Sequence, residues 1–316
     1  MDPEGGPTDP VPTPSELERL RAAVPPLVHF GTSTWTYPGW TGLVYSREYP
    51  ASGATARMLE EYARFPLFST VGIDSSFYGP PKPKTLAAWA AVLPPQFRAV
   101  SKAWDRLTVH TFTGPRDEGR TGRPNPDFLN AQLFRSDVWE LYRTHFGNHM
   151  GPFVFEFQTM GTDTRMTAER FANGLDRFFG SLPPEGEYGV ELRNPEFLTP
   201  AYFAVLREHG VAHVYNSWTR MPSIGEQLDL AGSITARFLV ARALLTPGRA
   251  YREAVDQFAP YDRIRAPNAE LRHDLVRLVH TAAGLRLPAY VLVNNRAEGS
   301  APLTIAAVAR TLAGAH

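Results

Sequence analysis

Short runs of consecutive apolar, β-branched and aromatic residues alternate along the chain with longer stretches in which apolar residues recur every three or four positions. The short runs have the length and composition of buried β-strands, and the longer stretches have the period of amphipathic helices. Regular alternation of strand and helix is typical of a parallel sheet wrapped by helices. The pattern therefore predicts an α/β fold from Leu27 onward.

The predicted strands are Val28–Ser33, Phe68–Asp74, Arg98–Ala103, Phe153–Phe157, Tyr188–Leu192, Ala212–Tyr215, Ile234–Leu239 and Ala289–Val293. The predicted helices are Ala54–Phe65, Lys84–Val92, Ala131–His145, Ala168–Phe179, Pro200–His209, Ile224–Leu230, Glu270–Ala283 and Pro302–Leu312. Such a chain can form either an open doubly wound sheet or a closed barrel. The sequence lacks both the Gly-x-Gly-x-x-Gly fingerprint after the first strand and a P-loop, so it carries no nucleotide-cofactor signature. We therefore predict a single-domain (β/α)8 TIM-like barrel.

Composition refines this picture. Residues 1–26 are rich in Pro, Gly, Thr and acidic residues, which predicts a disordered N-terminal tail before a barrel domain at 27–316. The chain has 316 residues and 43% hydrophobic residues, enough for one large barrel core. No run is apolar enough to span a bilayer and no signal-type segment precedes the barrel, so we expect a cytoplasmic protein.

Charge and cysteine content exclude several classes of function. Lys plus Arg and Asp plus Glu both number 32, so no overall field attracts nucleic acid or anionic membranes. The chain has no cysteine, which excludes disulfides, zinc fingers, iron–sulfur clusters and a thiol nucleophile. A divalent metal remains the one cofactor that these observations leave open.

Polar and aromatic residues gather at the predicted carboxyl ends of the strands, where catalytic groups of parallel barrels lie. The segments that follow the strands in order are 33–40, 74–78, 102–104 with His110 beyond, Glu156 to Gln158, Glu191 to Asn194, 216–218, Arg242, and 294–300. Every strand end contributes such groups. The sequence thus predicts a polar site at this end of the barrel.

Several of these segments carry recognisable motifs. They are Gly31-Thr32-Ser33-x-Trp35-x-Tyr37-x-x-Trp40, Ile73-Asp74-Ser75-Ser76-Phe77-Tyr78, Val190-Glu191-Leu192-Arg193 and Asn294-Asn295-x-x-x-Gly299-x-Ala301-Pro302. In this order, from about Phe30 to Leu312, they resemble the YecE-like family, domain of unknown function 72. The resemblance implies a (β/α)8-like barrel from the cytoplasm of a bacterium or archaeon, and it supplies no reaction. It implies site positions at Trp35, Tyr37, Trp40, Ser75, Phe77, Tyr78, Lys102, His110, Glu191, Arg193, Asn294 and Asn295.

The chain departs from the family pattern at two places. Relatives usually have Glu-x-Asn where this sequence has Gly72-Ile73-Asp74, and they often have Arg-x-His-Gly near the seventh strand, where this sequence has Arg237-Phe238-Leu239-Val240. If the missing Glu or His is catalytic in relatives, these departures imply altered chemistry.

The candidate catalytic residues are Glu191, His110 and Lys102. Lysine and arginine beside a carboxylate lower its pKa and keep it ionised, as a general base requires. The same charges also fit an interior ion pair, and His110 also fits an ordinary loop histidine. The candidate substrate-binding residues are Trp35, Tyr37, Ser75, Tyr78, Arg193, Asn294 and Asn295.

Two of these groups have structural alternatives. Asn294 and Asn295 precede the last helix, where backbone N–H groups favour an anion, but they also fit a turn and a helix cap. The aromatic residues after the first three strands fit either a wall that stacks on a sugar or base, or a hydrophobic plug. The plug is the preferred interpretation for Trp40 and Phe77.

Three hypotheses for function follow. The first is a hydrolase- or isomerase-like enzyme that performs acid–base chemistry on a small polar substrate, sugar-like or phosphorylated. The second is a metal-assisted nuclease or nucleic-acid-binding barrel, with bases on the aromatic mouth and phosphates on Arg116, Arg120 and Arg123. The third is a non-catalytic ligand-binding protein. A metal site, if present, would draw on Asp74, Glu156 and Glu191, with His110 as a further ligand.

Overall fold

The computed structural model describes residues 9–50, 52–112, 119–161, 164–245 and 257–314. The strands are β1 (Val28–Thr32), β2 (Thr70–Ile73), β3 (Arg98–Lys102), β4 (Met150–Phe157), β5 (Tyr188–Leu192), β6 (Ala212–Ser217), β7 (Leu239–Ala243) and β8 (Ala289–Val293). The helices are α1 (Pro14–Ala23), α2 (Thr55–Tyr62), α3 (Pro83–Ala90), α4 (Ala131–Leu133), α5 (Glu140–His145), α6 (Ala168–Phe179), α7 (Pro200–Glu208), α8 (Ile224–Asp229), α10 (Ala269–Leu285) and α11 (Ala301–Gly314). A π-helical turn, Phe134–Trp139, joins α4 to α5. None of the described helices combines the length and apolar character that crossing a membrane requires.

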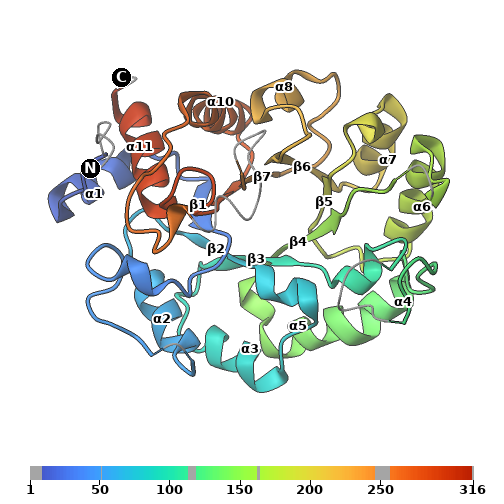
Figure 1. The fold of residues 1–316 in the computed structure, drawn as a ribbon, viewed down its shortest axis with the longest axis horizontal. Helices are drawn as coiled ribbons and strands as arrows, with labels where there is room; N and C mark the ends of the chain where they lie inside the picture. The colour runs from blue at the N-terminus through green and yellow to red at the C-terminus, as the bar shows by residue number, and fades with distance from the viewer. Residues whose placement is uncertain (1–8, 51, 113–118, 162–163, 246–256, 315–316) are drawn as a thin grey trace.

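The strands form one ring of eight, surrounded by helices (Figure 1). The hydrogen-bonded order is β1-β8-β7-β6-β5-β4-β3-β2, and every pair is parallel. At the seam between β1 and β2, the Tyr62 hydroxyl accepts a hydrogen bond from Thr32 N (2.8 Å) and donates one to Thr70 O (3.2 Å). A Cβ at Gly31 would lie 2.1 Å from Thr70 O, so only glycine allows this approach. The predicted (β/α)8 TIM-like barrel is confirmed.

The barrel interior is layered, because side chains two residues apart on a strand point to the same side. One interior layer is apolar and contains Val100, Val154, Val214, Val240 and Leu292. The residues two positions further along the same strands are Lys102, Glu156, Asn216, Arg242 and Asn294. The apolar layer therefore forms the floor beneath a polar layer at the carboxyl ends of the strands.

A second polar group closes the opposite, amino-terminal end of the barrel. Arg98 pairs with Glu187 (Nη2 to Oε2, 2.7 Å) and donates to the Tyr290 hydroxyl (2.8 Å). His29 stacks on the Tyr290 ring with 5.2 Å between ring centroids. The apolar floor separates this group from the polar layer at the carboxyl ends of the strands. Its residues can therefore serve as control positions for substitutions in that layer.

The seventh strand was predicted at the wrong place. The sequence predicted Ile234–Leu239, whereas β7 spans Leu239–Ala243. Thr235 instead fastens the preceding segment to β6, because its hydroxyl accepts from His213 N (2.8 Å) and donates to Val211 O (2.6 Å). The shift moves Arg242 from the loop beyond the strand into the barrel interior, where it is 1% exposed.

The predicted disordered tail is also wrong in part. Residues 14–23 form α1, with Thr13 accepting a hydrogen bond from Glu16 N as the N-cap. Leu17 and Leu20 are buried, and Glu16 pairs with Arg310 of α11 at 2.7 Å. Figure 1 shows α1 beside α11. Residues 1–8 lie outside the described residues.

His213 gives the fold a pH dependence that can be measured. The side chain is 1% exposed on β6, between the Tyr202 hydroxyl (3.1 Å) and Gln227 Oε1 (3.2 Å), and burial lowers its pKa to about 4. Between this value and about 6.5 the unfolded chain takes up a proton that the folded chain refuses, so stability falls as pH falls through that window. We expect His213 to contribute a loss of about 2 kcal/mol between pH 7 and pH 5.

Urea unfolding of the wild type and of His213→Gln at both pH values measures this contribution. The variant should be less stable at pH 7, because Gln fits the two partners less well, but its stability should fall less on acidification. Equal pH slopes for the two proteins would show that His213 is not the group responsible.

Candidate functional site

The carboxyl ends of the strands enclose a cavity of about 380 Å³, named here the strand-end cavity. Its lining residues are Thr34, Tyr37, Asp74, Ser75, Phe77, Tyr78, Lys102, Glu156, Gln158, Arg193, Trp218, Arg242, Leu244, Asn294 and Arg296. Every strand of the barrel ends in or leads to at least one of them. The lining thus has the location that parallel barrels use for catalysis.

Glu156 is the most heavily bonded carboxylate of the cavity wall. Its Oε2 lies 2.6 Å from Lys102 Nζ, 3.0 Å from Arg193 Nη2 and 3.4 Å from Arg242 Nη1. Gln158 donates to the other oxygen at 2.5 Å. Burial opposes the charged form, but the three cations outweigh it and hold the pKa of Glu156 well below its usual range. Glu156 is therefore a permanent negative charge that fixes the cations around it.

Glu191 lies directly beside Glu156, because the two residues are opposite each other on β4 and β5. It is fully buried, its Oε1 lies 2.5 Å from Arg193 Nη2 in an ion pair, and its Oε2 accepts a hydrogen bond from Arg242 Nη1 at 2.6 Å. Neighbouring strands are about 4.8 Å apart, so two carboxylates there repel unless cations separate them. Glu191 does not line the cavity. From this position Glu191 can orient the side chains of Arg193 and Arg242.

Arg242 is the centre of the cluster. It contacts Glu156 and Glu191 through Nη1 and Asp74 through Nη2, the last at 2.6 Å. Burial disfavours its charge, but these carboxylates together raise its pKa. Asp74, Glu156 and Glu191, the three candidate metal ligands, therefore surround the guanidinium of Arg242. Among the described residues, no group of three His, Asp or Glu side chains is placed to hold a metal ion.

Several buried polar atoms of this cluster have no hydrogen-bond partner among the described residues. They are Arg193 Nε and Nη1, Arg242 Nε, Asn216 Oδ1 and Glu191 Oε1, the last of which has only its ion pair with Arg193. Arg193 is 3% exposed and its guanidinium lies 3.9 Å above the Trp218 ring, so water reaches it poorly. Buried donors are nearly always satisfied in folded proteins. The described residues thus leave hydrogen-bonding capacity of Arg193 and Arg242 unused at the cavity wall.

The charge of the lining favours an anion. The cavity wall contains the cations Lys102, Arg193, Arg242 and Arg296 but only the carboxylates Asp74 and Glu156, and Glu191 lies directly behind them. Cations therefore exceed carboxylates by one in the whole cluster and by two on the wall itself. In a partly desolvated cavity such an excess attracts negatively charged groups.

Comparison with known proteins agrees with this architecture. The family model described as protein of unknown function DUF72 matches residues 29–316. The chain belongs to this family.

Solved structures of the family share the fold. A DUF72 family protein from Enterococcus faecalis V583 is 14% identical with a TM-score of 0.62, and the match covers 91% of this chain and 95% of that one. A DUF72 family protein from Thermotoga maritima MSB8 is 20% identical with a TM-score of 0.59, covering 90% and 98%. No curated protein matches the chain. These likenesses establish the DUF72 barrel and leave the reaction to be argued from the site.

Most of the predicted site residues line the strand-end cavity of this DUF72 chain. Lys102, Tyr37, Ser75, Tyr78, Arg193 and Asn294 do so. Trp35 does not, because it is 2% exposed, donates to Thr55 O (2.9 Å) and packs edge-on against Trp89. Asn295 does not either, because its Oδ1 accepts from Ala301 N (2.8 Å) at the first turn of α11. Asn295 thus makes the helix-capping contact, which was one of its two interpretations.

His110 lies apart from the other catalytic candidates. It follows β3 in the loop, bonds to the Thr111 hydroxyl (2.9 Å) and packs edge-on against Phe128. Burial lowers its pKa. It is not among the residues that line the strand-end cavity. The structure therefore separates His110 from Lys102 and Glu191, which the sequence grouped together.

The aromatic residues divide between wall and plug. Trp40 is fully buried and belongs to the core, as the plug interpretation predicted. Phe77 does both, because it lines the cavity and its ring lies 4.1 Å from Lys102 Nζ. Tyr37 and Tyr78 also line the cavity, and Trp218 adds a fourth aromatic face. The aromatic faces thus stand beside the cationic cluster.

The two departures from the family pattern have structural explanations. A Cβ at Gly72 would lie 2.7 Å from Ser33 O, so the β1–β2 seam leaves no room for a glutamate there. Asp74, two residues on and at the start of the helical turn that follows β2, supplies a carboxylate to the cavity wall. At the second departure, Arg237 and Phe238 precede β7, and the arginine within that strand is Arg242.

Sequence reasoning underestimated Arg242 and Trp218. It placed Arg242 in a loop, although a single arginine inside the apolar run from Phe238 to Leu245 was a signal of a buried, paired charge. Trp218 appeared only as the end of a strand, and nothing in its local sequence predicts the contact with Arg193. Arg116, which the nucleic-acid hypothesis invoked, lies outside the described residues.

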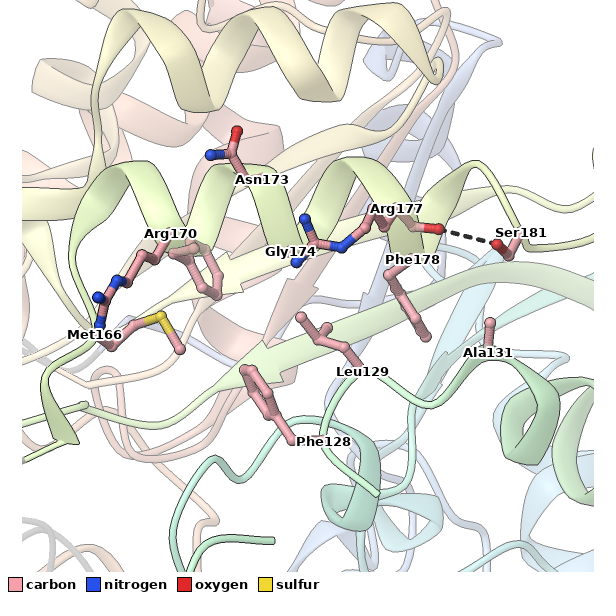
Figure 2. Close-up of a pocket in the computed structure, with 11 residues that line it drawn as sticks. Phe128, Leu129, Ala131, Met166, Arg170, Asn173, Gly174, Arg177, Phe178 and Ser181 are labelled. Atoms are coloured by element: carbon pink, nitrogen blue, oxygen red, sulfur yellow. Dashed lines mark hydrogen bonds between the residues drawn. The ribbon is translucent and has the colours of Figure 1, made fainter. Parts of the chain in front are cut away.

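A larger cavity, about 620 Å³, lies outside the barrel beside α6 (Figure 2). Phe128, Leu129 and Phe178 point toward one another beneath the helix, while Arg170 and Asn173 lie along it. No strand end reaches this cavity, and its lining contains no Asp or Glu. Size alone does not identify a site, and the chemistry favours the strand-end cavity.

Proposed function

We propose that this protein is an enzyme that transfers protons on a small polar substrate bearing an anionic group, sugar-like or phosphorylated. The observation that carries the proposal is the convergence of Lys102, Arg193, Arg242, Asp74 and Glu156 on one cavity of about 380 Å³. Cavities that hold small ligands commonly measure about 300–1,000 Å³. The unsatisfied N–H groups of Arg193 support binding of the anion.

Asp74 is the best candidate for the general base. Its Oδ2 is held by Arg242, whereas Oδ1 makes no hydrogen bond or ion pair with the described residues. A quarter of the side chain, 25%, is exposed, the largest exposure of the three clustered carboxylates. One oxygen fixed and one oxygen open is the arrangement that a proton acceptor needs.

Lys102 is the best candidate for the proton donor or charge stabiliser. Glu156 holds its ammonium at 2.6 Å, and 12% of the side chain is exposed. Phe77 shields one side. Glu156 and Glu191 then orient Lys102, Arg193 and Arg242 without contacting substrate. These roles replace the earlier assignment of proton transfer to Glu191 and His110.

Ligand-dependent thermal unfolding tests this proposal. The purified protein is screened against methyl phosphate, sugar phosphates, sugar acids, neutral sugars, divalent metals and short oligonucleotides. An anionic sugar at about one hundred times its Kd should stabilise by about 2.7 kcal/mol, which raises Tm by roughly 5 °C. In Arg193→Gln the ligand-induced rise should shrink strongly, because the anion loses its donors.

Arg98→Gln is the matched control, because it removes an ion-paired arginine at the opposite end of the barrel. The Tm of each variant is measured with and without ligand, so the effect of the substitution on stability itself cancels from the difference. Equal responses to neutral and anionic sugars, or an unchanged response in Arg193→Gln, would contradict the proposal. Stabilisation by oligonucleotides alone, lost at high salt, would favour the nucleic-acid hypothesis. Binding without turnover of any ligand would favour the non-catalytic one.

A further inference from the structure

Tyr78 is an exposed aromatic residue placed between two cavities. It ends the short helical turn after β2, with 67% of its surface exposed. Its ring packs edge-on against Phe77, which lines the strand-end cavity. Tyr78 itself lines both that cavity and a neighbouring one. A large ring exposed at the edge of a site is a feature of binding surfaces.

The neighbouring cavity, named here the ring pocket, has a volume of about 190 Å³. Its lining residues are Tyr78, Trp104, Asp105, Arg106, Val109, Phe112, Arg120 and Asn125. Trp104 stands two residues after Lys102, so the same stretch of chain leads from one cavity to the other. The ring pocket is thus a lateral extension of the strand-end cavity.

The lining of the ring pocket offers flat surfaces. Arg106 lies over the Trp104 ring at 5.4 Å, and Arg120 lies over the Phe112 ring at 4.2 Å. Aromatic rings and guanidinium planes both stack on planar π-systems. Two of the polar lining residues are engaged within the protein: Asn125 donates to Arg106 O and Val109 O and accepts from Asp127 N, and Arg106 pairs with Asp127. The stacking faces of the pocket are therefore its main feature for a planar ligand.

The volume fits one ring. An engineered protein cavity of about 150 Å³ accommodates benzene, so 190 Å³ accepts a single six-membered ring with small substituents. The anion-binding groups lie on the other side of Tyr78, in the strand-end cavity.

We propose that the ring pocket binds a planar aromatic ring that forms the distal part of the substrate, while the anionic part occupies the strand-end cavity. This inference rests on the proposed function and adds a substrate class to it: an anionic compound that carries an aromatic group. Tyr78 contacts the linkage between the two parts. Trp104 stacks on the ring.

A series of phosphate monoesters tests the ring pocket. Phenyl groups are joined to phosphate by linkers of increasing length, and each ester is paired with its cyclohexyl analogue and with methyl phosphate. Binding constants are measured by calorimetry. At the best linker length the phenyl ester should bind about tenfold more tightly than its cyclohexyl analogue, because stacking requires a planar π-face.

Two variants locate the ring. Trp104→Leu removes the stacking surface, and Val109→Phe fills the pocket; both should abolish the phenyl preference and leave methyl phosphate binding unchanged. Phe128→Leu is the matched control, because it changes a half-buried aromatic residue of the cavity beside α6 (Figure 2). It should retain the full preference.

The outcomes separate the two proposals. If methyl phosphate and the esters all fail to bind the wild type, both the anion site and the ring pocket are overturned. If methyl phosphate binds and no linker length gives a phenyl preference, the ring pocket alone is overturned. The same conclusion follows if the preference survives both Trp104→Leu and Val109→Phe, or if Phe128→Leu removes it.

Discussion

Replacement of Arg242 by methionine is expected to destabilise the protein by about 3–5 kcal/mol and to abolish binding of anionic ligands. Arg242 is 1% exposed and contacts Asp74, Glu156 and Glu191. Methionine approximates the length of the side chain but leaves Glu191 buried with Arg193 as its remaining ion-pair partner among the described residues. The loss of one of the two cations that pair with this buried carboxylate dominates the cost, because Glu191 is fully buried.

This expectation has a pH signature. Arg242 is one of the cations that lower the pKa of Glu156 in the wild type, so its loss should raise that pKa. The wild type then loses more stability than the variant as pH falls, and the deficit in unfolding free energy should shrink toward pH 4. Chemical denaturation at pH 7 and near pH 4 measures both values.

Arg277→Met is the control for loss of an arginine. Arg277 pairs with Asp229 at 2.7 Å, but the two side chains are 39% and 64% exposed, and such surface pairs contribute about 0–1 kcal/mol. The double variant Arg242→Met/Glu191→Gln should recover part of the lost stability, because it removes a stranded charge. If Arg242→Met is as stable as Arg277→Met, the cluster is not the buried ion network described here.

Asp74→Asn is expected to have the largest effect on turnover, lowering kcat by about 10²–10⁴-fold while KM changes little. The amide keeps the size of the side chain and can still accept from Arg242, but it cannot take a proton. Because Asp74 is 25% exposed and Arg242 retains Glu156 and Glu191, the stability cost should be small. Steady-state kinetics on an anionic sugar that the screen shows to bind, and that the wild type turns over, measures both constants.

Glu187→Gln is the control for this prediction. It neutralises a carboxylate of similar exposure, 32%, paired with Arg98 at the opposite end of the barrel. It should leave kcat unchanged. A kcat near the wild-type value in Asp74→Asn would place the general base elsewhere, and Lys102→Met would then decide whether the lysine performs both proton transfers.

The strands show how much of the fold the local sequence pattern predicts. Seven of the eight predicted strands overlap the observed ones over most of their length, because buried parallel strands are short continuous apolar runs. The seventh failed because Ile234–Leu239 and Leu239–Ala243 are both apolar and β-compatible. Which of two such runs pairs with β6 depends on contacts such as the Thr235 bonds to β6, and local sequence does not encode them.

The candidate site also combines features that the local sequence predicts with features that it does not. The sequence placed Glu191 and Arg193 on one strand face, because the two-residue alternation is a local property. It did not predict that Glu156 stands opposite Glu191, since register between strands is set by the whole ring. His110 shows the converse error, because proximity in sequence to Lys102 suggested a shared site that the loop does not form.

By itself, the sequence determined the barrel, the end of the barrel that carries the polar groups, and most of the residues in its wall. Periodicity and composition are sufficient for these, because they follow from local geometry and burial. Only the tertiary structure decided which charges meet. Arg242 joins carboxylates from β4, β5 and the end of β2, and Trp218 covers Arg193, because closure of the ring brings strand ends together that lie far apart along the chain.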